Sequence, residues 1–347
     1  MSDPALSIER SQAKKADLVL EGGGVKGIGL LGAVIALSEA GYAFPRIAGT
    51  SAGAIVGALV AGYARAGKDL HDLVPVMNAL DYKQFEDKTA LDHLGPVGEA
   101  AELLIGRGVY KGDFLVSWLG RQLEQLGIET FGDLRISDED DPGSALPGNE
   151  RYRLVVMASD ISLGQLVRLP WDCRAHYGTD PDQLRVVDAV RASMSIPFFF
   201  QPATLTRSDH KKVTLVDGGM LSNFPIECFD RPDSGSRWPT FGVKLSARRG
   251  AQQRARDAST TIKLAIACLE TLLAEHDAYH LDDEHVTERT IFVDTFGVQA
   301  TDFGIDPPTQ TRLYQSGRDA GARFARSWPP AHFTAAGVWS GPPAAPR

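Results

Sequence analysis

The chain has 347 residues, 43% of them hydrophobic, and can therefore bury the core of one large α/β domain or of two smaller domains. Its 36 Lys and Arg residues against 44 Asp and Glu residues give a formal net charge of -8, which excludes the overall positive charge typical of nucleic-acid-binding proteins. Three cysteines without a CxxC pair do not indicate a disulfide framework and favour a reducing compartment.

No membrane-spanning or secretory segment is predicted. Residues 1–16 are polar and charged and lack the apolar stretch of a signal peptide. The longest run of small apolar residues, 52–64, is too short to span a bilayer and contains three glycines. We therefore expect a cytoplasmic protein that meets membranes only at their surface; secretion without a signal peptide stays open.

The first elements alternate strand, glycine turn and helix. Residues 16–21 predict a short strand, followed by a glycine turn and a helix over 25–40. A second strand near 46–48 leads to another glycine turn and a helix that ends at about residue 66. Two such units in succession are typical of an α/β fold with a parallel sheet.

The segment 69–127 has a helical pattern broken by Gly and Pro, and we interpret it as an inserted helical cap. An acidic loop is expected at 138–148. Further strands are predicted at 151–158, 165–169, 212–216, 240–245 and 290–294, and further helices at 186–194, 260–281 and 308–326. We expect one catalytic domain over residues 1–328 and a loose Pro- and Gly-rich tail over 329–347.

The first motif with chemical meaning is Gly49-Thr50-Ser51-Ala52-Gly53. A serine between two glycines, at a turn from strand to helix, presents its hydroxyl at the C-terminal edge of the sheet. The helix behind it directs its N-terminal amides toward developing negative charge. The motif is therefore typical of a nucleophilic serine; the alternative is that Ser51 only caps the helix.

A glycine-rich loop, Gly22-Gly23-Gly24-Val25-Lys26-Gly27, follows the first predicted strand. Its unobstructed amides can bind a phosphate or a developing oxyanion. The same residues satisfy GxGxxG, but a dinucleotide site needs an acidic residue after the second strand, where this chain has none. No Lys-Ser or Lys-Thr pair closes the loop as in a phosphate-binding Walker motif.

A third motif, Asp217-Gly218-Gly219, ends the predicted strand 213–216. An aspartate at the end of a strand, followed by two glycines, is expected to face a cleft rather than lie buried in the sheet. A simple turn is the alternative, because Asp-Gly is a common turn dipeptide.

In this order, the three motifs resemble those of the patatin-like phospholipases. Asn223 and Pro225 fit the extension of the third motif, and residues 192–199 are similar to the Ala-Ser-x-x-x-Pro block of the family. Residues 108–113 resemble the bacterial branch, which includes secreted effector phospholipases. The resemblance covers residues 17–296, and the family more often has Arg where this chain has Lys26.

The resemblance implies a three-layer α/β/α fold with a mainly parallel sheet, and a lipid acyl hydrolase that acts on phospholipids or lysophospholipids. Ser51 would be the nucleophile and Asp217 its base, with no histidine, metal or cofactor. The amides of Gly22, Gly23 and Gly24 would form the oxyanion hole. The supporting motif residues would be Lys26, Gly27, Gly49, Gly53, Gly218 and Gly219. The partners would be a lipid ester and a membrane surface; nucleic acid is not expected, and the need for an activating protein stays open.

Two other functions fit parts of the sequence. A carboxylesterase or lipase with a Ser-Asp-His triad would use His276, His280 or His285, which fall on or just after a predicted helix, whereas a triad histidine belongs on a loop after a strand. A non-catalytic lipid-binding protein could share the same fold.

The eight histidines show no zinc-binding spacing, so the sequence does not indicate a zinc site.

Overall fold

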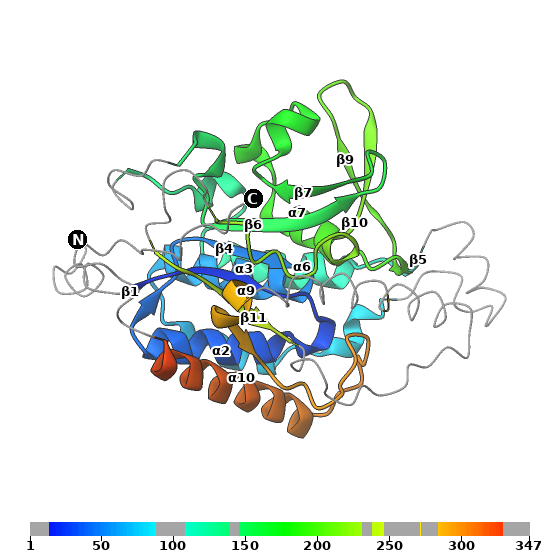
Figure 1. Ribbon diagram of the computed structural model, residues 1–347. Coiled ribbons are helices and arrows are strands. Elements are labelled where there is room, and N and C mark those ends of the chain that lie inside the picture. The colour runs from blue at the N-terminus through cyan, green and yellow to red at the C-terminus, as the bar shows by residue number, and fades with distance from the viewer. Residues whose placement is uncertain are drawn as a thin grey trace, which may run out of the picture.

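The computed structural model describes residues 14–87, 108–138, 146–230, 238–245, 271 and 284–328. Its centre is an eight-stranded mixed sheet in the order β12-β11-β2-β4-β6-β10-β9, in which β7 also pairs with β6 (Figure 1). The strands are β2 (Asp17–Leu20), β4 (Ile47–Thr50), β6 (Leu154–Asp160), β7 (Gln165–Leu169), β9 (Ala203–Thr206), β10 (Lys212–Asp217), β11 (Thr240–Lys244) and β12 (Thr290–Phe292). Two small parallel pairs join β1 (Lys14–Lys15) to β3 (Tyr42–Ala43), and β5 (Gly108–Tyr110) to β8 (Phe198–Phe200).

Strands β12, β11, β2, β4 and β6 are parallel neighbours. Every residue of β2, β4, β6 and β11 is buried, as expected for parallel strands covered on both faces. The part of the sheet formed by β6, β7, β9 and β10 is antiparallel. The expected α/β fold with a mainly parallel sheet is thus confirmed. The structure adds an antiparallel part, built from hairpins, which makes the sheet mixed.

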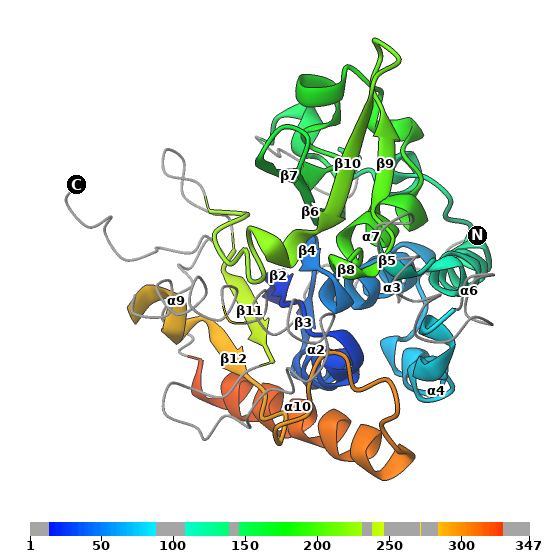
Figure 2. The same ribbon diagram turned by 90° about the vertical axis from the view of Figure 1, so that its right-hand side faces the viewer.

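Four helices, α2 (Gly27–Glu39), α3 (Ala52–Ala66), α7 (Val186–Ser193) and α10 (Pro307–Ser327), lie along one face of the sheet, and α9 (Glu284–Glu288) lies on the other side (Figure 2). Helices α2 and α10 approach closely because glycines face the partner backbone. A Cβ atom at Gly317 would overlap the carbonyl oxygen of Gly29, and one at Gly32 would overlap that of Tyr314. Within the described residues, no helix combines the length and the apolar character needed to cross a bilayer.

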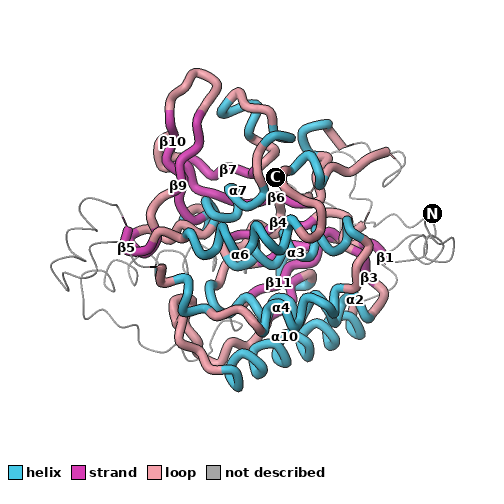
Figure 3. The backbone as a smooth tube through the Cα atoms, turned by 180° about the vertical axis from the view of Figure 1, so that it is seen from behind, coloured by secondary structure: helices cyan, strands magenta, loops and turns pink. Residues whose placement is uncertain are grey.

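The described parts of the predicted cap contain α4 (Leu73–Asn78) and α6 (Asp113–Glu124), which lie on the same side of the sheet as α3 (Figure 3). Leu115 and Trp118 are buried there and belong to the core. The remainder of the cap, 88–107, with Leu103, Leu104 and Ile105, lies outside the described residues, as do the tail 329–347 and nearly all of the helix predicted at 260–281. The domain boundaries and the cap therefore stay predictions.

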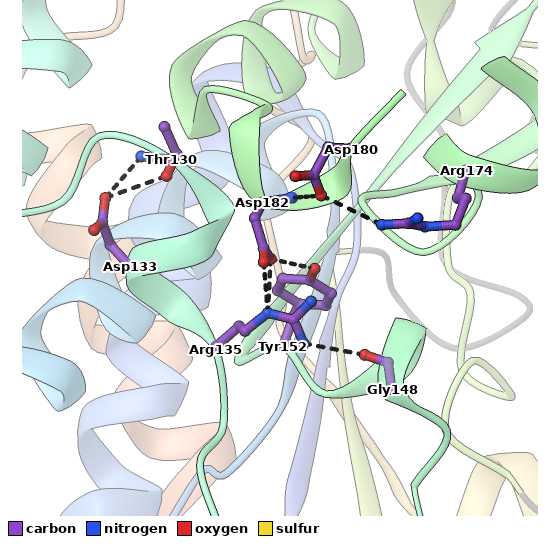
Figure 4. Close-up of polar contacts among 8 residues, drawn as sticks. All are labelled: Thr130, Asp133, Arg135, Gly148, Tyr152, Arg174, Asp180 and Asp182. Carbon is purple, nitrogen blue, oxygen red and sulfur yellow. Dashed lines mark hydrogen bonds and ion pairs between the residues drawn. The ribbon is translucent and has the colours of Figure 1, made fainter. Parts of the chain in front are cut away.

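A polar cluster fixes the chain that leads into α7 (Figure 4). Asp182, in the 3-10 helix Pro181–Gln183, accepts hydrogen bonds from Arg135 Nε at 2.7 Å and from the Tyr152 hydroxyl at 2.6 Å. Thr130 pairs with Arg185 in an antiparallel bridge. Because Tyr152 precedes β6 and Arg185 precedes α7, the cluster holds the start of α7 against the sheet.

The sequence predictions for the first two strands, the two helices after them, and most later strands are confirmed within a few residues. The sequence patterns do not predict strands β1, β3, β5, β8 and β9. Four of these are only two or three residues long, too short to show the alternating pattern that marks a strand. The fifth, β9, has alternating partial exposure and pairs with β10 at the edge of the sheet.

Candidate active site

Strands β4 and β10 meet end to end along one edge of β6. Strand β4 runs parallel to β6 and its last residue, Thr50, pairs with Met157. Strand β10 runs in the opposite direction, and its last residue, Asp217, pairs with the next residue of β6, Ala158. Strand β7 pairs with both of these β6 residues and so occupies the other edge. The two strands therefore deliver Ser51 and Asp217 to the same point.

Ser51 occupies a strained turn at the N-terminus of α3. Its φ of 52° and ψ of -120° lie in a region that non-glycine residues rarely adopt. The flanking glycines make the turn possible, because a Cβ at Gly49 would overlap the backbone of Gly53, and a Cβ at Gly53 would overlap the carbonyl of Leu20. The Ser51 side chain makes no capping hydrogen bond to α3, so the helix-cap interpretation does not account for this serine.

Asp217 is buried, with only 6% of its surface exposed. Burial raises the pKa of its carboxyl to about 7, although hydrogen bonds from the Gly219 amide and the Ser51 hydroxyl oppose the rise. The Gly219 amide lies 2.8 Å from Asp217 Oδ1. Gly218 is packed so closely against the Met157 carbonyl that no side chain would fit. The Ser51 hydroxyl thus donates a hydrogen bond to a carboxyl group whose proton affinity is raised by burial.

The glycine loop lies against Ser51. A Cβ at Gly22 would be 3.2 Å from Ser51 Cβ and would overlap the side chain of Asn223. The Gly22 amide donates to the Asn223 carbonyl at 3.1 Å. Gly23 and Gly24 stand at the first turn of a 3-10 helix, Gly24–Lys26, where amides have no partner inside the helix. These two amides are therefore better placed than that of Gly22 to bind an anion.

Gly24 has a φ of +57°, in the left-handed region. The carbonyl of Ala300 accepts a hydrogen bond from the Val25 amide at 3.1 Å and covers Gly24 so closely that a Cβ there would overlap it. A segment 276 residues further along the chain, counted from Gly24 to Ala300, thus supports the glycine loop. No sequence motif indicated this contact, because residues 296–302 contain no regular element.

A buried ion pair anchors the start of the glycine loop. Glu21 Oε1 pairs with Lys244 Nζ, and Glu21 Oε2 accepts a hydrogen bond from the Leu245 amide. Both charged side chains are at most 4% exposed. Because Glu21 directly follows β2 and Lys244 is the last residue of β11, the pair fixes the glycine loop relative to the sheet.

Residues 192–199, which begin in the last turn of α7, are indicated in the sequence only through the family resemblance. In the structure, Ser193 Oγ accepts a hydrogen bond from the Ser51 amide at 2.8 Å. The Ser195 carbonyl accepts one from the Asp217 amide at 2.9 Å. Both serines are fully buried. Their spacing alone carried no signal, since serines at i and i+2 are common in turns.

A family model described as patatin-like phospholipase matches residues 18–230, which include all three motifs. The chain belongs to the patatin-like phospholipase family. The resemblance stated from the motifs is thereby confirmed, and the lipid hydrolase class follows from it. The nearly full-length relative YqhO of Bacillus subtilis, an uncharacterized protein, is 35% identical over 313 residues, covering 90% of this chain and 98% of that protein.

Two further proteins are similar to this chain, one over a short region and one at low sequence identity. Lysophospholipase NTE1 of Chaetomium globosum is 42% identical over 77 residues, which cover 22% of this chain and 4% of that protein. The crystal structure of VipD from Legionella pneumophila aligns with a TM-score of 0.51 at 19% identity, covering 90% of this chain and 67% of that chain. At this identity the likeness to VipD shows the fold alone.

Apolar residues follow two segments of the candidate site of this patatin-like protein in sequence, 192–195 and 217–219. Phe199 and Phe200 are buried, and Phe199 stacks on Phe303 with ring centroids 5.2 Å apart. Phe198, by contrast, is 46% exposed. Directly after the third motif, Met220 and Leu221 are 41% and 36% exposed. Of residues 198–200, two phenylalanines therefore belong to the core and one lies at the surface.

Among the described residues of the patatin-like chain, no cluster of three or more His, Cys, Asp or Glu side chains could hold a metal ion. His276 and His280 lie outside these residues, and His285 belongs to α9. Helix α9 precedes β12, so its backbone stands at the N-terminal ends of the parallel strands. Ser51 follows the C-terminal end of β4 and therefore lies at the opposite ends of these parallel strands.

Proposed function

We propose that this protein hydrolyses the carboxylic ester bonds of phospholipids or lysophospholipids, with Ser51 as nucleophile and Asp217 as base. One observation carries the proposal: two opposed strands bring a serine in a strained turn into hydrogen-bond contact with a buried carboxyl of raised pKa. Membership of the patatin-like phospholipase family supports the lipid substrate class. The match to a protein named lysophospholipase supports it further, over the short region that is shared.

In the acylation step, Ser51 Oγ attacks the ester carbonyl carbon while its proton passes to the Asp217 carboxylate. The carbonyl π electrons move to oxygen and form an oxyanion. When the tetrahedral intermediate collapses, the C–O bond to the alcohol breaks and the alcohol leaves with the proton from Asp217. The products of this step are an acyl ester on Ser51 and, for a phospholipid, a lysophospholipid.

In the deacylation step, water attacks the acyl ester and gives a proton to Asp217. Collapse of the second intermediate returns that proton to Ser51 Oγ and releases the fatty acid. A base with a pKa of about 7 accepts a proton from an alcohol more readily than an ordinary carboxylate does. Burial of Asp217 is thus the physical reason that no histidine is needed in this scheme.

The amides of Gly23 and Gly24 are the donors that we assign to the oxyanion, because the Gly22 amide already binds the Asn223 carbonyl. One such donor lowers the barrier by about 3 kcal/mol. Gly49, Gly53 and Gly218 support this site by permitting close approach of neighbouring backbone, and Gly22, Gly27 and Gly219 by leaving room for neighbouring side chains. Lys26 adds positive charge beside the glycine loop.

A Ser-Asp-His esterase is the second candidate. Against it, the backbone of His285 lies at the N-terminal ends of the parallel strands, whereas Ser51 lies at their C-terminal ends. Asp217 also contacts the Ser51 hydroxyl directly. A non-catalytic lipid-binding protein is the third candidate. It gives no reason for a strained serine next to a proton-accepting carboxyl.

The test uses purified protein with mixed phospholipids, lysophospholipids and p-nitrophenyl esters, followed by product analysis. Ser51→Ala and Asp217→Asn should each remove nearly all hydrolysis, and the double variant should be little worse than either. A fluorophosphonate probe should label Ser51 in the wild type, which separates an enzyme from a binding protein. Full activity of Asp217→Asn, or loss of activity on changing one histidine, would refute the Ser-Asp pair.

A further inference from the structure

The segment 191–195 contacts both members of the proposed catalytic pair. Ser193 Oγ binds the Ser51 amide at 2.8 Å, and the Ser195 carbonyl binds the Asp217 amide at 2.9 Å. The two contacts come from alternate residues of one short stretch at the end of α7. The position of this stretch therefore sets how the serine and the aspartate lie relative to each other.

The contact with Ser193 acts on the strained residue itself. A non-glycine residue with positive φ keeps that conformation only if its surroundings hold it there. Ser51 is 4% exposed and Ser193 is fully buried, so without the Ser193 hydroxyl the Ser51 amide would lose its partner in a place that water reaches poorly. The bond also engages the Ser51 amide, so this amide is not an oxyanion donor.

Arg191 holds the same segment from the other side. Its Nη1 donates to Ser195 Oγ at 2.6 Å, and its Nη2 donates to the carbonyls of Gln201, at 2.9 Å, and of Lys111. Ser195 Oγ in turn donates to the Arg191 carbonyl at 3.0 Å. One guanidinium thus ties the ends of β5 and β8 to the residue that binds the Asp217 amide.

The partners of Arg191 are hydroxyl and carbonyl groups. Within the described part of the chain it forms no ion pair with a carboxylate; Asp87 and Asp113 stabilise its charge only from a greater distance. Gly112, with a φ of +76°, leaves the space that the guanidinium fills. A planar fork that reaches several acceptors at once is a property of Arg that Lys lacks.

We propose that Ser193 and Arg191 are positioning residues for hydrolysis, Ser193 through the Ser51 amide and Arg191 through Ser195 and the Asp217 amide. The proposal rests on the proposed function, since it assigns these residues to the same reaction. Neither side chain takes part in the bond changes. Each keeps the hydroxyl and the carboxylate at the separation that proton transfer requires, and small displacements there have large effects on rate.

The experiment compares Ser193→Ala, Ser193→Thr and Arg191→Lys with the wild type. Arg185→Lys is the matched control, because Arg185 precedes the same helix, is about half exposed, and pairs only weakly with Asp188 at 3.7 Å. The measurements are kcat and KM on a p-nitrophenyl ester, the rate of fluorophosphonate labelling of Ser51, and the thermal unfolding midpoint. Labelling needs the activated serine but not turnover.

Ser193→Ala and Arg191→Lys should lower kcat and the labelling rate roughly 10- to 100-fold, with KM changed by less than about threefold. Ser193→Thr keeps the acceptor and should restore most of the labelling rate, and Arg185→Lys should behave as the wild type. If Ser193→Ala does not fold, Ser193→Cys, which keeps a weaker acceptor of similar size, is compared with Ser193→Thr instead.

A wild-type labelling rate in a folded Ser193→Ala protein would overturn the role of Ser193, and one in Arg191→Lys would overturn the role of Arg191. In both cases the proposed function would stand. A wild type that neither hydrolyses esters nor labels at Ser51 would instead refute the proposed function, and with it this assignment.

Discussion

Thr50 and Asp217 are the last residues of two strands that run toward each other and pair with adjacent residues of β6, Met157 and Ala158. Ser51, which follows Thr50, and Asp217, which we propose as nucleophile and base, lie 166 residues apart in sequence and are thus brought together by backbone pairing. A purely parallel sheet could not do this, because two strands that share one edge of a neighbour must then point the same way. The antiparallel part of the sheet is therefore what places Asp217 beside Ser51.

The rate of ester hydrolysis should depend on pH through Asp217. Burial raises the pKa of this carboxyl to about 7, and only its ionised form can accept the Ser51 proton. We expect kcat/KM to rise with pH along a limb with a midpoint near 7 and to level off above it. The measurement is the pH profile on a soluble p-nitrophenyl ester between pH 4 and 9. A midpoint between 4 and 5 would show that Asp217 is not the base or is not desolvated.

The same carboxyl should lower the stability of the folded protein at neutral pH. Its pKa is about 7 when folded against 3.8 for the ordinary group, so between these values the folded state binds more protons than the unfolded state. The free energy of unfolding must then fall as pH rises from about 4 to 7, and its contribution is constant above that range. At full strength the effect is on the order of 4 kcal/mol.

Asp217→Asn, which cannot ionise and keeps an acceptor for the Gly219 amide, should therefore be inactive yet more stable than the wild type at pH 8. The two proteins should be closely similar in stability at pH 4. Urea unfolding at the two pH values measures the difference, and using the pair of proteins cancels the titration of all other groups. An equal or lower stability of the variant at pH 8 would contradict the raised pKa of a buried carboxyl at this position.

Much of this site could be predicted from local sequence. The strained turn at Ser51 follows from glycines that must sit on either side of it, and the glycine loop and Asp217-Gly218 follow from similar steric needs. The supporting contacts could not be predicted. The Ala300 carbonyl contacts Gly24, and the Ser193 hydroxyl accepts a hydrogen bond from the Ser51 amide, so both contacts join segments far apart in the chain. No residue type or spacing in these segments indicates that they lie side by side. The short strands β5 and β8 were missed for a related reason, since their pairing partner defines them.

Gly24→Ala should disrupt the proposed oxyanion hole. Its Cβ would overlap the Ala300 carbonyl, and its φ of +57° disfavours any side chain, so the loop backbone must move. Displacing one oxyanion donor costs roughly 100- to 1000-fold in kcat. Gly41→Ala is the matched control, since Gly41 also has a positive φ, +86°, but has open space around it. That variant should lose only about 1–2 kcal/mol of stability and keep its activity. Equal kcat values for the two variants would remove Gly24 from the oxyanion hole.

Met220 and Leu221 should help the enzyme to act on lipid in a membrane. They directly follow Asp217-Gly218-Gly219 and leave 41% and 36% of their surfaces exposed, although both are apolar. Apolar side chains beside a site that takes acyl chains can enter the bilayer surface during catalysis. Partial burial of one such side chain stabilises the bound state by about 1–2 kcal/mol, so its loss should reduce the rate on vesicles roughly tenfold.

The test compares Met220→Ser and Leu221→Ser with the wild type on phospholipid vesicles and on a short soluble ester. Leu163→Ser is the matched control, because Leu163 is 44% exposed but lies in the turn after β6, several residues beyond Ala158. We expect a loss on vesicles only, and only for the two variants beside the site. The overall charge of -8 disfavours binding to anionic lipid by electrostatics alone, so the loss should persist at high salt. Equal losses on both substrates would indicate damaged packing around Asp217, and a selective loss in Leu163→Ser would place the membrane contact on the turn after β6.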